Sequence, residues 1–218
     1  MIRVNAVDKS YGKQRILKNV SVCFEAGHIY GLVGPNGSGK TTLMKCIVGF
    51  APPDNGAIYI NEKRIGKDVD FAPSTGLILE VPEFLGQWNA MQNLMQLSKI
   101  SHAADQNRIR QCIRLVGLNP DDPKPVGKYS LGMRQRLGIA QAIMEDPEHL
   151  ILDEPFNGLD QQGVEEIHLL LQRLKADGKT IILASHSAHD LSRACDTILE
   201  LQDGKLIISQ QNERKNER

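Results

Sequence analysis

Residues 34–41 carry the side-chain types and spacing that hold a triphosphate. They read Gly34-Pro35-Asn36-Gly37-Ser38-Gly39-Lys40-Thr41, which fits the pattern G-x-x-x-x-G-K-[ST] of a phosphate-binding loop. The glycines let successive backbone N–H groups point at phosphate oxygens, and the following helix adds its positive N-terminal end. Lys40 supplies a charge for the β- and γ-phosphates, and the Thr41 hydroxyl is a ligand for Mg²⁺. With Thr42, this segment is the predicted nucleotide-binding set, and a Gly-rich turn that binds nothing is the alternative.

A pair of carboxylates follows an apolar run later in the chain. His149-Leu150-Ile151-Leu152 leads directly into Asp153-Glu154. In enzymes with this type of loop the first carboxylate holds Mg²⁺, so we expect Asp153 to be a metal ligand. Glu154 is then placed to orient and deprotonate the attacking water near the γ-phosphate. The alternative is two solvated charges at the end of a strand.

Both motifs need a sheet and helices to position them. Residues 29–33 form a short apolar run before the loop, and residues 42–50 have helical spacing, so strand, loop and helix form an α/β unit. We expect further strands near 4–6, 21–24, 76–80, 150–152, 180–183 and 198–201, and helices over 131–144 and 164–176. The region from about 88 to 145 is predicted to be helical apart from a proline-rich loop over 119–125, and the polar tail after Ser209 is expected to fray.

Composition narrows the classes of protein. The chain has 218 residues with 26 basic and 26 acidic side chains, which argues against nucleic-acid binding driven by bulk charge. No apolar run approaches the ~18 residues of a membrane-spanning helix, and the N-terminus lacks the apolar core of a signal peptide. The four cysteines are scattered, which favours buried thiols in a reducing compartment. We therefore expect a cytosolic protein whose membrane role, if any, comes through a partner.

From about Ile2 to Ser209, the order of motifs resembles the ATP-binding subunits of ABC transporters. Ser10-Tyr11-Gly12 is similar to the family's adenine-stacking aromatic, and the resemblance implies that the Tyr11 ring lies against adenine. Stacking of that kind is worth about 1–3 kcal/mol. The alternative is a turn aromatic that covers the edge of a strand.

The segment from residue 129 to 136 resembles the family's signature motif, usually written L-S-G-G-Q. Ser130 and Gly132 match that motif, whereas Leu131 replaces a glycine and Met133 replaces the glutamine. The resemblance implies that Ser130, Gly132 and Met133 bind the γ-phosphate of an ATP held by the opposite subunit, with help from the helix N-terminus. The alternative is an ordinary helix capped by serine.

Three more positions take their roles from the same resemblance. Asn157-Gly158-Leu159-Asp160 resembles the D-loop that communicates between subunits, so Asp160 joins the predicted binding residues. His186 resembles the switch histidine that contacts the γ-phosphate and holds the attacking water. Glu80 stands where the family has the Q-loop glutamine; it is a predicted ligand of Mg²⁺, and its extra negative charge should raise the need for that ion.

The resemblance implies a fold and a function. The fold is α/β: a P-loop NTPase core of the ABC nucleotide-binding type, with an antiparallel β subdomain and a helical insertion at about 85–148 in a single domain 1–218. The function is ATP binding and hydrolysis with Mg²⁺ by a head-to-tail homodimer, or a paired ATPase subunit, at the inner face of the membrane. It drives a separate transmembrane permease without nucleic acid. Glu80 and the signature segment resemble the bacitracin and lantibiotic-immunity exporters, which move antimicrobial peptides or lipids.

Other interpretations stay open at this point. A soluble ABC-type ATPase of translation or DNA repair is the second interpretation, and a nucleotide-binding module without catalysis is the third. In the family, a helix of the membrane subunit docks beside the Q-loop, here residues 81–97. Phe84, Leu85, Trp88 and Met91 are apolar and either line such a groove or close the core of the helical region.

Overall fold

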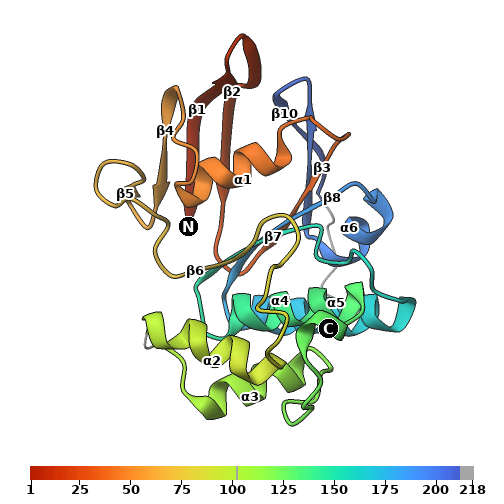
Figure 1. Ribbon diagram of the computed structural model, residues 1–218. Helices are drawn as coiled ribbons and strands as arrows, with labels where there is room; N and C mark the ends of the chain where they lie inside the picture. The colour runs from red at the N-terminus through yellow and green to blue at the C-terminus, as the bar shows by residue number, and fades with distance from the viewer. Residues whose placement is uncertain (102, 212–218) are drawn as a thin grey trace.

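The structure of the protein is a computed structural model that describes residues 1–101 and 103–211. Figure 1 shows a small sheet beside a larger one, with helices on the faces of the larger sheet. The small sheet has the strand order β2-β1-β4-β5, and the larger sheet has the order β10-β9-β3-β8-β7-β6. This arrangement confirms the expected α/β fold with a separate antiparallel sheet.

The small sheet is antiparallel and half-buried. It consists of β1 (Ile2–Tyr11), β2 (Gln14–Phe24), β4 (Asn55–Ile60) and β5 (Lys63–Arg64), and β1 pairs antiparallel with both β2 and β4. Helix α1 (Lys40–Val48) packs between the two sheets, because its Leu43 and Ile47 share one core with Ile58 of the small sheet and Ile182 of the larger one. The helix that follows the phosphate-binding loop is therefore fixed on both sides.

The larger sheet brings several strand ends to one edge. Strands β3 (Ile29–Val33), β6 (Thr75–Ile78), β7 (His149–Asp153), β8 (Thr180–Ser185) and β9 (Thr197–Gln202) are joined by parallel pairings, and β10 (Lys205–Gln211) pairs antiparallel with β9. The carboxyl ends of parallel strands meet at the same edge of a sheet. The phosphate-binding loop, the acidic pair and the predicted switch histidine therefore converge there, although they are far apart in the sequence.

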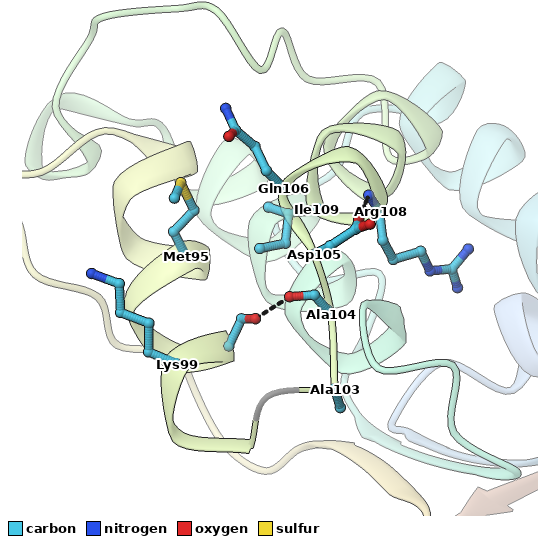
Figure 2. A pocket seen from close by; sticks show the side chains of 9 residues that line it. Met95, Lys99, Ala103, Ala104, Asp105, Gln106, Arg108 and Ile109 are labelled. Carbon is cyan, nitrogen blue, oxygen red and sulfur yellow. Dashed lines mark hydrogen bonds between the residues drawn. The ribbon is translucent and has the colours of Figure 1, made fainter.

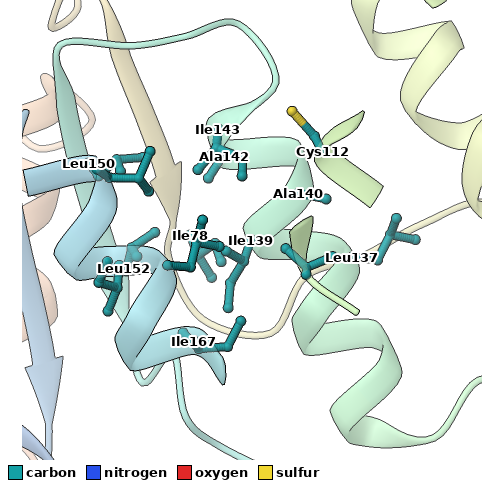
Figure 3. Close-up of a cluster of buried hydrophobic side chains, with 14 of the residues drawn as sticks. Ile78, Cys112, Leu137, Ile139, Ala140, Ala142, Ile143, Leu150, Leu152 and Ile167 are labelled. Carbon is teal, nitrogen blue, oxygen red and sulfur yellow. The ribbon is translucent and has the colours of Figure 1, made fainter. Parts of the chain in front are cut away.

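The remaining helices are α2 (Ala90–Ser101), α3 (Gln106–Leu115), the 3₁₀ turn η1 (Val126–Lys128), α4 (Leu131–Ile143), α5 (Gln161–Ala176) and α6 (Ala188–Ala194). Of these, α4, α5 and α6 pack against the larger sheet, whereas α2 and α3 pack against each other, with α3 also against α4 (Figure 1). Figure 3 shows Ile139 of α4 beside Ile78 of the sheet, in the second core, which also contains Leu137 and Leu152. The elements α2, α3, η1 and α4 lie between β6 and β7 in the chain, and the subdomain boundaries 85–148 stay a prediction.

Several expectations about local structure are wrong in detail. The predicted long helical region is interrupted before Asp105, whose side chain caps α3 by accepting from the N–H of Arg108. Strand β10 was not predicted, and it extends beyond Ser209 to Gln211. Residues 212–218 lie outside the described part of the chain. Asp203 and Gly204 both have positive φ and form the hairpin turn between β9 and β10; an Asp-Gly pair is a sequence signal for such a turn. Cys23 is exposed, unlike the other three cysteines, which are buried as expected.

Candidate functional site

The phosphate-binding loop connects β3 to α1 and curls around the ammonium group of Lys40. That group donates hydrogen bonds to the carbonyls of Gly34 (2.6 Å) and Pro35 (3.2 Å), and the side chain is buried. Gly39 precedes the helix with φ 107°, a conformation that favours glycine. Gly34 lies so close to the carbonyl of Leu201 that a side chain would collide with it. The sequence folds here as the motif predicts, since glycine is needed at both positions.

A buried hydroxyl in the loop supports the binding of phosphate. The Oγ atom of Ser38 is buried and has no hydrogen-bond partner within the described residues. A buried hydroxyl without a partner is costly unless a ligand satisfies it. The loop opens on a cavity of about 490 Å³, lined by Gly37, Lys40 and Thr41 together with residues of other strand ends. The residues present therefore fit a triphosphate.

Thr41 and Asp153 form the oxygen pair that a magnesium ion requires. The Thr41 hydroxyl donates to Oδ2 of Asp153 at 2.6 Å, which joins the start of α1 to the end of β7. Burial raises the pKa of the Asp153 carboxyl, the charge of Glu154 acts in the same direction, and the hydrogen bond from Thr41 opposes both. A cation at this position relieves the cost of a buried carboxylate. The donor set, a hydroxyl and a carboxylate beside the phosphate position, fits Mg²⁺.

Within the described part of the chain, no group of three or more His, Cys, Asp or Glu side chains is placed to hold a metal ion. Magnesium at a nucleotide needs no such group, since it keeps waters and phosphate oxygens as ligands. Glu80 was predicted as a third ligand with Thr41 and Asp153. The structure instead places its Oε1 atom 2.7 Å from the Nζ atom of Lys45. Glu80 does line the same cavity, so it lies near the predicted metal position but is paired with a lysine.

Glu154 and His186 lie together at the ends of β7 and β8. The backbone N–H of His186 donates to Oε1 of Glu154 at 2.9 Å, and the Nδ1 atom of the histidine lies 3.0 Å from the same oxygen. The hydroxyl of Ser185 donates to Oε2 at 3.1 Å. Both oxygens of the carboxylate are therefore held, and Ser185 is a contact that the motifs did not indicate.

Gln135 is a second residue of the site that the sequence did not indicate. It is buried on α4, lines the cavity and donates from Nε2 to the backbone carbonyl of Glu154 at 3.2 Å. It lies within the segment 129–136, four positions after Leu131, which lines the same cavity. That spacing is the signal that could have identified it.

The other predicted binding residues lie outside this cavity. Tyr11 is 52% exposed at the end of β1, with the Nζ atom of Lys9 5.6 Å from its ring centroid. Ser130 is the exposed N-cap of α4 and accepts from the N–H of Met133 at 3.2 Å. Asp160 caps α5 by accepting from the N–H of Gly163 at 2.8 Å. As described, the cavity is not lined by Tyr11, Ser130, Gly132, Met133 or Asp160.

Leu131, the substituted position of the signature motif, contacts the predicted D-loop of the same chain. Its side chain lies where a Cβ atom on Gly158 would fall, and Gly158 has φ 74°. Leu131 also lines the cavity at the phosphate-binding loop. The two loops are therefore packed against each other by a side chain that a glycine would not provide.

A different cavity, of about 580 Å³, lies between α2 and α3 (Figure 2). Met95, Lys99 and Ile109 line it, and its lining residues include none of the predicted site residues. In the predicted docking region, Met91 is buried in the core and Phe84 packs against it, whereas Leu85 and Val81 are exposed. Met91 is therefore a core residue, and the exposed apolar atoms come from the segment just after Glu80.

The family model and the similar proteins all belong to the same family. A family model described as ABC transporter matches residues 17–157. An uncharacterized ABC transporter ATP-binding protein of Bacillus subtilis, YybJ, is 45% identical over 210 residues, which is 96% of each chain. The lantibiotic transport ATP-binding protein SrtF of Streptococcus pyogenes is 36% identical over 97% of this chain and 91% of its own. The bacitracin transport ATP-binding protein BcrA of Bacillus licheniformis is 37% identical over 95% of this chain and 68% of its own.

Solved structures agree with the sequence relatives. The ATP-binding subunit of an ABC transporter superposes with a TM-score of 0.85 and 25% identity over 97% of this chain and 90% of that one. The protein cbiO1 of Clostridium perfringens, part of the transporter complex cbiONQ, superposes with a TM-score of 0.80 and 26% identity over 95% and 86% of the two chains. No helix within residues 1–101 or 103–211 is both long and apolar enough to span a membrane.

Proposed function

This chain belongs to the ABC transporter family and is an ATP-binding protein with ATPase activity, and from that premise we propose that it powers a separate membrane permease as one half of an ATPase dimer. The observation that carries the proposal is the division of the predicted nucleotide contacts between two places. Lys40, Asp153 and Glu154 line one cavity, whereas Ser130 lies on the exposed end of α4 and does not line it in the described structure.

A head-to-tail pair of chains resolves this division. Each ATP is held by the phosphate-binding loop and Tyr11 of one chain, and its γ-phosphate meets Ser130, Gly132 and Met133 of the other. Such a pair has a two-fold axis and two equivalent sites. Because both chains contact the γ-phosphate, ATP closes the dimer and hydrolysis opens it again. This opening and closing is the motion that the permease uses.

The catalytic roles proposed for this chain follow from the contacts at the strand ends. Glu154 orients the attacking water and takes its proton, and His186 holds the carboxylate and the water in place. Thr41 and Asp153 are the residues that would hold Mg²⁺, which neutralises phosphate charge when bound. Lys40 turns from the loop carbonyls to the β- and γ-phosphates.

The proposed class of cargo follows the names of the relatives, and the proposed direction follows the sequence resemblance to exporters. SrtF and BcrA are named for lantibiotic and bacitracin transport, and both match nearly the whole of this chain. We propose that this protein serves the export of an antimicrobial peptide or lipid from the cytoplasm. Its place is then at the inner face of the cell membrane, where it is held by the permease.

Affinity purification of the Glu154→Gln chain from detergent-solubilised native cells tests this proposal. The variant is expected to hold ATP and stay assembled, so mass spectrometry should find a polytopic membrane protein near one-to-one stoichiometry. Ribosomal or DNA-repair proteins without a membrane partner would point instead to a soluble ATPase of the same family.

A further inference from the structure

Helix α1 carries two side chains of the nucleotide region on one face, one turn apart. Thr41 contacts Asp153, and Lys45, four positions later, contacts Glu80. Residues four apart lie above one another on a helix. Lys45 therefore lies one helical turn along α1 from Thr41, which is a predicted ligand of the metal. Lys45 itself belongs to none of the motifs.

The ion pair between Lys45 and Glu80 joins α1 to the segment that follows β6. The Nζ atom of Lys45 lies 2.7 Å from Oε1 of Glu80, and the two side chains are 35% and 67% exposed. Glu80 has φ 66°, a left-handed conformation that a residue with a side chain rarely adopts. Such a conformation persists where the surroundings hold it, and it occurs most at switch regions and ligand sites.

The charges around the cavity explain why a counterion is needed there. Glu80, Asp153 and Glu154 all line it, and Lys40 is the basic residue among its described lining residues. A glutamine at position 80 would add no charge. The glutamate adds one, and Lys45 compensates it from just outside the cavity.

We propose that Lys45 is a positioning residue and that Lys45 and the magnesium ion of the nucleotide are alternative counterions for Glu80. Without the ion, the lysine holds the carboxylate on α1. When the ion is bound beside Thr41 and Asp153, the carboxylate leaves the lysine and faces the ion, and the segment from Glu80 to Leu85 moves with it. This inference rests on the proposed ATP and magnesium chemistry, but not on the permease.

The test is a double-mutant cycle of Lys45→Gln and Glu80→Gln in which the binding of a nucleotide analogue is measured. A fluorescent, non-hydrolysable ATP analogue is bound to the full chain in chelator-treated buffer, and the magnesium concentration that gives half of the signal change is measured. Lys45→Gln should lower that concentration, because Glu80 no longer has to give up a partner. We expect Lys45→Gln to lower the half-saturating magnesium concentration by a factor that is about threefold larger in the unaltered background than in the Glu80→Gln background. A threefold factor corresponds to the interaction energy of an exposed ion pair. The difference should shrink at high salt.

Two further variants serve as controls. Lys45→Arg keeps the cation and should behave as the unaltered chain does. Arg110→Gln removes an ion pair of 2.6 Å between the middle of α3 and Asp121, and should leave the magnesium dependence unchanged. Thermal denaturation of each variant confirms that it is folded.

The outcomes separate the hypotheses. An equal effect of Lys45→Gln with and without the Glu80→Gln substitution would mean that the lysine acts only through its charge, and the proposal would be wrong. A higher magnesium requirement in Lys45→Gln would mean that the lysine presents Glu80 to the ion, which also overturns it. If binding of the analogue to the unaltered chain did not depend on magnesium, this inference would be wrong, whereas the proposed function would still be decided by the membrane protein that co-purifies with the Glu154→Gln chain.

Discussion

The carboxylate of Glu154 is held by His186, the residue directly after strand β8, with Oε1 2.9 Å from the backbone nitrogen of His186 and 3.0 Å from its Nδ1 atom. Glu154 itself has φ 48°, in the left-handed region. Strained backbone of this kind is concentrated at functional sites. The geometry therefore fixes one carboxylate at the point where strands β7 and β8 end, next to the phosphate-binding loop.

Replacing Glu154 with glutamine removes the proton acceptor and keeps the shape. We expect hydrolysis to slow at least about a hundredfold, because a general base contributes on that scale. ATP binding should persist, and gel filtration with ATP should show a trapped dimer. Glu148→Gln, at the opposite end of β7, is the matched control and should hydrolyse ATP normally. A monomeric and fully active Glu154→Gln chain would contradict both roles.

His186→Ala leaves the backbone contact to Glu154 and removes the ring. The loss of one hydrogen bond to a charged group is worth about 1.5–3 kcal/mol, so hydrolysis should slow by about ten- to a hundredfold. Steady-state phosphate release measures this effect. His189→Ala removes an exposed histidine three positions away and should have no effect. Equal rates in the two variants would exclude His186 from catalysis.

Lys40→Ala removes the charge at the centre of the phosphate-binding loop. The ATP dissociation constant should rise by about ten- to a hundredfold, the range expected for one lost contact to a charged phosphate. Calorimetric titration with ATP measures it. Lys63→Ala, on the exposed strand β5, keeps the net charge equal to that of Lys40→Ala and should bind ATP normally. Unchanged affinity in Lys40→Ala would refute the assignment of the loop.

His149 should make the protein sensitive to acid. The side chain is 2% exposed, and burial lowers its pKa to about 4. The unfolded chain therefore takes up a proton near pH 6.5, whereas the folded chain resists until about pH 4. The free energy of unfolding then falls as the pH drops through this window, by about 3 kcal/mol from this residue.

The variant His149→Leu tests this pH dependence. Both ring nitrogens of His149 are buried without a hydrogen-bond partner in the described structure, so an apolar side chain of similar size should raise stability at pH 7 by about 1 kcal/mol. Urea unfolding at pH 7 and pH 5 measures both effects. The variant should lose less stability than the unaltered chain between these values, and parallel losses would show that other groups control the acid response.

The phosphate-binding loop, the acidic pair and the α/β class could be predicted from the sequence alone. The reason is that each depends on residues close together in the chain. Glycines at fixed spacing determine the curl around Lys40, and an apolar run before Asp153 determines that the carboxylate ends a buried strand. Strand β10 was missed although its Asp203-Gly204 turn is local, because the polar residues at its end resemble a frayed tail and leave only a short apolar run to indicate a strand.

The tertiary structure decided which of these residues meet. Lys45 and Glu80 are 35 positions apart, and Glu154 and His186 are 32 apart, so no local pattern could pair them. Only the order of the parallel strands brings the ends of β6, β7 and β8 to the loop after β3. The sequence thus determined the chemistry that each segment can perform, and the sheet determined which charges neutralise one another, because Coulomb interactions depend on distance in space and not along the chain.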